Sequence, residues 1–272
     1  MSKKQKSKPH STGMPFRTEI GPTMGRGQDN VVYDMVYPAE KTHLRHSSGQ
    51  VIKINHASGG EHRIRYADNR KAAMAGLEYK KNKYDILKLF LGDFIPRTSF
   101  VLSKVTEGHT ERYGELTIQD KVPKLSLSDL TPEQRQSPVL RQQVVDLMAR
   151  LRRMYQVIGE ANARTTSGVT LDGRLDLGGV SAYVKTESFD HEFDESDAET
   201  IINSNKSPNL LVNPEDMSLY CIDFDQGQWR PGMDEAKDLV FELARKQNAV
   251  AAHIGSSVLH PDQPQLPFSA IE

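Results

Sequence analysis

The sequence predicts an α+β protein in which an antiparallel sheet comes first and mainly helical structure follows. β-Branched and aromatic residues fill residues 31–37 and 51–54, as in strands. Apolar residues recur at three- and four-residue steps in 67–91 and 139–158, as on one face of a helix. Val122-Pro123 interrupts the pattern between these two kinds of structure. We therefore expect two lobes that meet near residue 122.

The first lobe contains most of the predicted strands and one long helix. Strands are expected at residues 18–20, 31–37, 51–54, 95–102 and 115–120. The helix at 67–91 ends at Gly92-Asp93, because glycine favours helix termination. A glycine turn at 25–27 joins the first two strands, and 38–50 is expected to be a polar loop.

The second lobe begins with the most regular helical pattern in the chain. We expect this helix at 139–158, ended by Gly159, and a second amphipathic helix at 234–248. Between them, the acidic stretch 187–199 reads as a flexible insert. Two short strands are expected at residues 210–212 and 219–222, joined by the turn Asn213-Pro214-Glu215-Asp216.

Composition limits the classes of protein and partner. The chain has 272 residues and a net charge of −1, so neither nucleic acid nor a membrane surface is an expected partner. Its single cysteine, Cys221, excludes an internal disulfide framework. No apolar run reaches membrane-spanning length, and no apolar segment follows the basic N-terminus as in a signal peptide. We expect a cytoplasmic protein, or one delivered from a bacterial cytoplasm. The expected organisation is a disordered basic tail at 1–17, lobes at 18–121 and 122–255, and an extended tail at 256–272.

Three residues of the first lobe, Gly25, Gly27 and Lys53, suggest phosphate binding. Glycines at Gly25 and Gly27 let backbone N–H groups approach phosphate oxygens, although an ordinary hairpin turn has the same composition. A strand, not a helix, follows them, which argues against a dinucleotide-binding fold. Lys53 lies inside an apolar strand and would need a carboxylate to hold it. Glu78, on the predicted helix, is a better candidate than Glu61, which lies in a polar loop.

The second lobe offers oxygen ligands for a metal ion. Asn209 and Asp223 flank the predicted pair of short strands, and Asp225 follows two residues later. Amide and carboxylate oxygens suit Mg²⁺, and an aspartate after a buried strand is costly without a partner. The sequence therefore predicts that this hairpin binds magnesium.

In order and spacing, these motifs resemble the protein-kinase-like superfamily across residues 20–240. Residues 25–33 are similar to its glycine-rich loop, with Asn30 in place of a glycine. Residues 207–212 resemble the end of its catalytic loop, and 222–225 its magnesium-binding motif, with Asp225 in place of glycine. The resemblance implies a bilobal fold, with an antiparallel-sheet N-lobe and a mainly helical C-lobe, that binds ATP and Mg²⁺.

The resemblance also assigns roles to single residues. It implies catalytic roles for Lys53, Glu78, Lys206 and Asp223, contacts to the nucleotide from Gly25, Gly27, Val32, Lys53, Gln119 and Val122, and metal ligation by Asn209 and Asp223. Gln119 to Val122 would form the hinge beside adenine, and Lys206 would approach the γ-phosphate.

One departure leaves the activity open. Ser204 stands where the family has its catalytic aspartate, and Asp176 is a distant substitute that also suits a glycine-rich turn. Phosphoryl transfer depends mainly on positioning and charge neutralisation, so turnover does not require that base. Three functions stay open: transfer of a phosphoryl or nucleotidyl group to an unknown protein or small-molecule hydroxyl acceptor, a pseudokinase that binds nucleotide or another protein without turnover, and a scaffold that binds no nucleotide.

Overall fold

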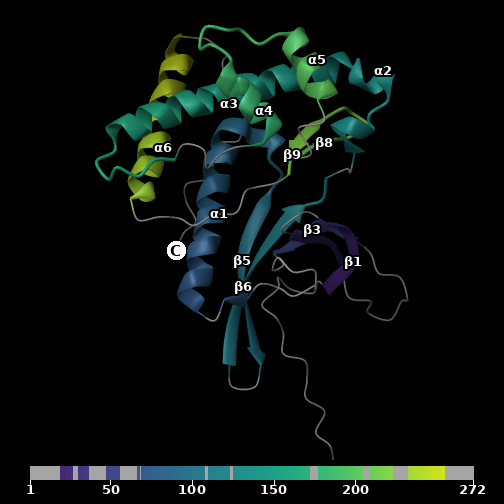
Figure 1. Ribbon diagram of the computed structural model, residues 1–272, viewed down its shortest axis with the longest axis vertical. Helices are drawn as coiled ribbons and strands as arrows, with labels where there is room; N and C mark the ends of the chain where they lie inside the picture. Colours follow the sequence, from purple (N-terminus) through teal and green to yellow (C-terminus); the bar gives the residue numbers. More distant parts are fainter. Residues whose placement is uncertain are drawn as a thin grey trace, which may run out of the picture. The chain divides into compact units, whose positions relative to one another are not determined.

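The computed structural model describes residues 19–26, 30–36, 47–55, 66–67, 69–107, 110–122, 125–171, 177–204, 209–222 and 232–254 (Figure 1). The chain divides into two compact units. The sheet unit comprises Met1–Lys81, Pro96–Val122 and Gln226–Trp229, and the helical unit comprises Asn82–Ile95, Pro123–Asp225 and Arg230–Glu272. The predicted mixed α+β class with an antiparallel sheet is confirmed.

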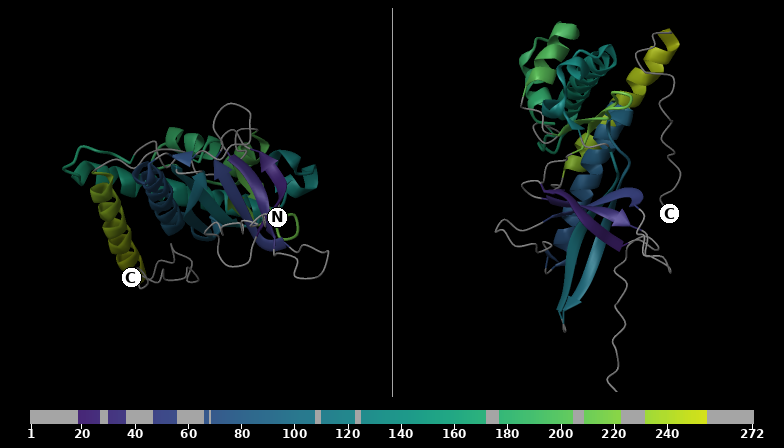
Figure 2. Two further views of the ribbon diagram at one scale, coloured as in Figure 1. Left: turned by 90° about the horizontal axis from the view of Figure 1, so that it is seen from below. Right: turned by 90° about the vertical axis from the view of Figure 1, so that its right-hand side faces the viewer.

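The sheet unit holds six described strands, and every pairing among them is antiparallel. They are β1 (Glu19–Arg26), β2 (Asn30–Val36), β3 (Ser47–Asn55), β4 (Tyr66–Ala67), β5 (Thr98–Glu107) and β6 (Thr110–Asp120). The order runs β1-β2-β3-β6, and β4 also pairs with β6. β5 forms a long hairpin with β6, from Thr98–Gln119 to Glu107–Thr110 (Figure 2). β3 begins at Ser47, inside the stretch expected to be a loop.

One face of this sheet is apolar. Met35, Ile52, Leu116 and Ile118 form a buried cluster, and Tyr33 and Val101 pack against it. Ile52 pairs with Tyr33 on one side and with Ile118 on the other, so these three form one cross-strand row, and the paired Leu116 and Val101 belong to the next. Because successive side chains of a strand alternate between faces, the residues between these positions belong to the opposite face.

Helix α1 (Arg70–Leu91) contributes its first part to the sheet unit and its last part to the helical unit. The helix begins at Arg70 and not at 67, because Asn69 accepts a hydrogen bond from the backbone N–H of Lys71 at 2.8 Å, as an N-cap does. It ends as predicted at Gly92, whose φ is +54°, and η1 (Gly92–Phe94) follows. The Lys88 ammonium donates to the carbonyls of Gly92 and Ile95, at 3.0 and 2.9 Å.

The helical unit is built around α3 (Pro138–Arg164). Its other described elements are β7 (Leu125–Ser126), η2 (Leu127–Asp129), α2 (Pro132–Arg135), α4 (Gly179–Thr186), α5 (Glu195–Asn203), β8 (Leu210–Val212), β9 (Leu219–Cys221) and α6 (Met233–Ile254). α4, α5 and α6 all contact α3 (Figure 1). One side of α3 is fully buried: Leu140, Val144, Leu147, Met148, Leu151, Met154, Val157, Ile158 and Ala161.

Two predictions for this unit were wrong. Helix α3 continues through Gly159 to Arg164, because a buried stripe that includes Ile158 and Ala161 outweighs the roughly 1 kcal/mol helix penalty of one glycine. The acidic stretch 187–199 is not simply a flexible insert, because α5 starts within it. The Asp194 carboxylate accepts hydrogen bonds from the backbone N–H groups of Ser196 and Asp197, so these acidic residues act as an N-terminal cap.

Among the helices in the described ranges, none is long and apolar enough to cross a membrane.

Candidate functional site

The face of the sheet opposite the apolar cluster carries four buried polar side chains: Asp34, Lys53, Thr117 and Gln119. We call it the polar face. Lys53 is buried almost as deeply as its neighbour Ile52: it keeps 9% of its surface exposed, and Ile52 is fully buried. Burying such groups is costly unless their hydrogen bonds and charges are satisfied. A sheet face with this composition therefore indicates a constraint other than core packing.

Strand pairing brings three of the predicted nucleotide contacts into one row of the polar face. Gly25 of β1 pairs with Val32 of β2, Val32 pairs with Lys53 of β3, and Lys53 pairs with Thr117 of β6. Directly paired residues in an antiparallel sheet point to the same face. A glycine, an apolar side chain and a lysine thus follow one another across three strands. Gly27 lies outside the described residues.

A second row contains Gln119, another predicted contact. Gln119 pairs with Val51, which pairs with Asp34, and on its other side Gln119 pairs with Thr98. The Gln119 amide donates to Thr98 Oγ1 at 3.1 Å, and that hydroxyl donates to the carbonyl of Pro96 at 2.9 Å. Gln119 is therefore held in one orientation at 2% exposure.

The chain beyond this row is also anchored to the sheet. The backbone N–H of Lys121 donates to the carbonyl of Gly49 at 2.8 Å. Its ammonium lies 3.4 Å from the Asp34 carboxylate, which gives this polar-face aspartate a cationic partner. Val122, the last of the predicted hinge residues, is half-buried and directly follows.

The contact predicted between Glu78 and Lys53 stays a prediction. Glu78 is exposed and lies outside the stripe of α1 that buries Ala73, Gly76 and Lys80, whereas Lys53 is buried. Helix periodicity explains the difference, since position 78 is half a turn away from both 76 and 80.

Glu115 is a carboxylate of the polar face that sequence reasoning missed. It precedes Thr117 by two residues on β6, so it faces the same side as Lys53 and is its diagonal neighbour, a position about 7–8 Å away in ideal sheets. Its carboxylate pairs with the ammonium of Lys80 on α1 at 2.9 Å, with both side chains mostly buried. The alternation of Glu115, Thr117 and Gln119 with apolar Leu116 and Ile118 was the available signal.

A glycine allows this close approach of helix and strand. A Cβ on Gly76 of α1 would meet Glu115 Oε1 at 2.0 Å and its Cδ at 2.6 Å. No side chain fits there unless the carboxylate moves. Gly76, Lys80 and Glu115 therefore act together in attaching α1 to the polar face.

In the helical unit, a hairpin places Asn209, one of the predicted metal ligands, opposite Ile222. β8 and β9 pair in the register Leu210–Cys221, and the backbone N–H of Ile222 donates to the carbonyl of Asn209 at 3.0 Å. Gln143 of α3 anchors this hairpin by accepting from the N–H of Leu219 at 2.8 Å and donating to the carbonyl of Met217 at 3.1 Å. Asn209 thus lies opposite the residue that precedes Asp223, which is itself outside the described residues.

Ser204 is used to end a helix. Its hydroxyl donates to the carbonyl of Ile201 at 3.0 Å, and its backbone N–H donates to the same carbonyl at 3.1 Å. A serine hydroxyl engaged in this way at the end of α5 is no substitute for a general base. Lys206 and Asp176 lie outside the described residues, so their predicted roles stay predictions.

Within the described ranges, no group of three or more histidine, cysteine, aspartate and glutamate side chains could hold a metal ion. The two oxygen donors assigned to Mg²⁺ are the amide of Asn209 and the carboxylate of Asp223, and Asp223 lies outside the described residues. No known family model matches the sequence, and no curated protein is significantly similar to it.

Proposed function

We propose that this protein is kinase-like, binds ATP with Mg²⁺, and transfers a phosphoryl or nucleotidyl group to a hydroxyl acceptor. The observation that carries the proposal is the row Gly25, Val32 and Lys53 on the polar face. An antiparallel sheet in one unit and mainly helices in the other agree with the bilobal architecture that the sequence resemblance implies.

The residues present suit this ligand. The Lys53 ammonium would neutralise the α- and β-phosphates, and glycines 25 and 27 would let backbone N–H groups approach phosphate oxygens. Gln119 and Val122 would border the base. Asn209 and Asp223 would hold the metal ion through oxygen atoms. When bound, magnesium–ATP supplies the group to be transferred and neutralises its charge.

Glu115 takes over the orienting role that the sequence gave to Glu78. A carboxylate near the lysine keeps that side chain charged and restricts its rotation. Glu115 faces the same side as Lys53, and its pair with Lys80 fixes its own position. In this chain the sheet supplies the carboxylate and the helix supplies a second lysine.

A pseudokinase is the second candidate, and Ser204 is the observation that favours it. The Ser204 hydroxyl donates to the carbonyl of Ile201, so this residue supplies no proton acceptor where the family has its catalytic aspartate. Nucleotide binding would persist in this case, because Lys53, Asn209 and Asp223 do not depend on that residue.

The first test is a thermal-shift titration with ATP and MgCl₂. We expect wild type to be stabilised in a saturable way, Lys53→Met to lose the shift, and Asp223→Ala to lose its dependence on magnesium. Lys71→Met is the matched control, since Lys71 is an exposed lysine of the same unit. Equal shifts in all four proteins, or none in wild type, would reject the nucleotide site.

Labelled ATP then separates the two candidates. Transfer of label from γ-labelled ATP indicates a kinase, and transfer from α-labelled ATP indicates a nucleotidyl transferase. Binding without transfer of either label to candidate acceptors or to the protein itself favours the pseudokinase.

A further inference from the structure

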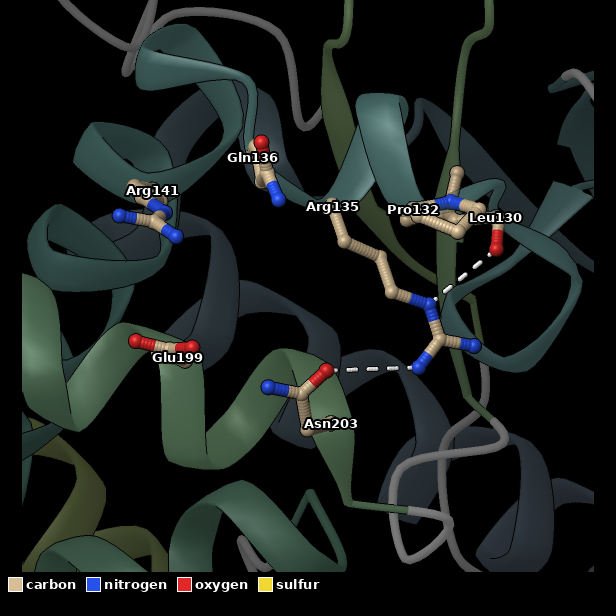
Figure 3. A pocket seen from close by; sticks show the side chains of 7 residues that line it. All are labelled: Leu130, Pro132, Arg135, Gln136, Arg141, Glu199 and Asn203. Carbon is tan, nitrogen blue, oxygen red and sulfur yellow. Dashed lines mark hydrogen bonds between the residues drawn. The ribbon is translucent and has the colours of Figure 1, made fainter.

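A pocket of about 430 Å³ opens in the helical unit between α2, the start of α3, and α5. Its walls are formed by Leu130, Pro132, Arg135, Gln136, Arg141, Glu199 and Asn203 (Figure 3). Arg135 and Arg141 lie on opposite sides of the opening in this view, with Gln136 and Asn203 between them. The volume falls within the roughly 300–1,000 Å³ of small-molecule sites.

Arg135 is fixed in place by uncharged groups. Its guanidinium donates to the carbonyl of Leu130 at 3.1 Å, to the carbonyl of Ser128 at 3.0 Å and to Asn203 Oδ1 at 3.4 Å. No carboxylate takes part in this set. The hydrogen bonds hold the guanidinium rigidly at the pocket wall, and its positive charge is left without a compensating anion among these three partners.

The positive charge of Arg141 is only weakly compensated as well. Among the described residues its Nε is buried without a hydrogen-bond partner. Its Nη1 lies 3.6 Å from a Glu195 carboxylate whose side chain is 77% exposed. An ion pair of that length with an exposed carboxylate contributes little. The Arg141 side chain lines the pocket and keeps 23% of its surface exposed, so a ligand oxygen can reach the guanidinium there.

Side chains of the pocket suit an oxyanion. A guanidinium presents a planar fork of N–H donors that matches carboxylate and phosphate oxygens. The lining contains two arginines and one glutamate, so its net charge is positive. Since Asn203 Oδ1 accepts from Arg135, the amide nitrogen of Asn203 is its remaining polar atom, and this is a donor.

We propose that this pocket binds an oxyanion, a phosphate or carboxylate group of a small ligand, between Arg135 and Arg141. The proposal concerns the helical unit alone and does not depend on nucleotide binding. Asn203 is the last residue of α5 and directly precedes Ser204, so a ligand held here would lie beside the end of that helix.

The test is a titration of the full chain with inorganic phosphate and, separately, with citrate, followed by isothermal calorimetry and thermal shift. Sodium chloride at equal ionic strength corrects for screening. We expect saturable binding of at least one anion, weakened about tenfold or more in Arg141→Gln, the loss expected for one charge-assisted hydrogen bond. Binding of phosphate alone identifies a phosphate ligand, and binding of citrate alone a carboxylate.

Matched variants make the outcome decisive. Arg164→Gln removes the same charge from an exposed position of the same helix, where Arg164 pairs with Glu160, and should bind like wild type. Arg141→Lys, which keeps the charge but loses the fork, should bind with intermediate affinity. Equal weakening in Arg164→Gln and Arg141→Gln, or shifts no larger than those of sodium chloride, would overturn the proposal.

Discussion

Two neighbours on β3, Ile52 and Lys53, are both buried but belong to opposite faces of one sheet. Ile52 is fully buried in a cluster made only of apolar side chains. Lys53 lies in a row with Gly25, Val32 and Thr117, beside a second row that holds Asp34 and Gln119. The side chains named on the two faces are similarly buried, but those of one face are apolar and most of those on the other are polar or charged.

This difference separates stability from function. Burial of apolar area stabilises a fold by roughly 25 cal/mol per Å², whereas buried charged and amide groups at best compensate their desolvation. The apolar face therefore accounts for the stability of the sheet. On the proposed function, the polar face provides ligand binding, and variants on the two faces should affect different measurements.

The largest effect is expected from Ile52→Ala. Removing a fully buried isoleucine side chain should reduce the free energy of unfolding by ~2–5 kcal/mol, measured by urea denaturation. Thr117→Val, which replaces a hydroxyl of similar size on the polar face, should change it by about 1 kcal/mol or less. If the threonine variant loses as much stability as the isoleucine variant, the two faces do not differ in the way described.

An intermediate effect is expected from Gly76→Ala. In a helix this change normally stabilises by up to about 1 kcal/mol, but here the new Cβ must displace the Glu115 carboxylate from Lys80. We expect a net destabilisation of about 1–2 kcal/mol, as for other overpacked sites.

The double variant provides the control for this contact. In a Glu115→Ala background the clash is absent, so Gly76→Ala should become neutral or stabilising, and a double-mutant cycle should give a clear coupling energy. Stabilisation by Gly76→Ala in both backgrounds would show that Glu115 does not lie against the helix.

The smallest effect is expected for Glu235, a carboxylate that stabilises the helical unit through hydrogen bonds. Hydrogen bonds from the backbone N–H of Thr166 and from the hydroxyls of Thr165 and Thr166 lower the pKa of Glu235 to about 2. The backbone N–H of Ser167 also donates to it at 3.0 Å. These contacts tie the start of α6 to the end of α3.

The sign of the pH dependence follows from that lowered pKa. The stabilisation from ionised Glu235 is fully present above its ordinary pKa of 4.5 and is lost as the pH falls toward 2. Urea midpoints measured from pH 6 to 2 should therefore fall less steeply in Glu235→Gln than in wild type. Parallel profiles would contradict this assignment.

Local sequence patterns predicted much of the fold but less of the site. The β-branched and aromatic residues of β2 and the helical periods of α1 and α3 were sufficient to locate these elements, because each signal depends on nearby residues. The roles of Gly159 and Asp194 were misread, since tertiary burial and capping outweigh single-residue preferences.

Pairing between distant strands was the missing information at the site. Lys53 was singled out because it lies in an apolar strand that follows a glycine turn. Its carboxylate neighbour was sought on the helix, at Glu78, because register cannot be read from one strand alone. Only the pairing of Lys53 with Thr117 shows that Glu115 faces the same side.

The most direct test of the account is a methyl NMR titration with a non-hydrolysable ATP analogue and Mg²⁺. Methyl groups of Val32, Val51 and Thr117 report on the polar face, and those of Met35, Ile52, Leu116 and Ile118 report on the apolar face. We predict saturable shifts in the first set, with the second set nearly unchanged. Shifts confined to the apolar set, or none in either set at millimolar nucleotide, would contradict the claim that the polar face binds nucleotide.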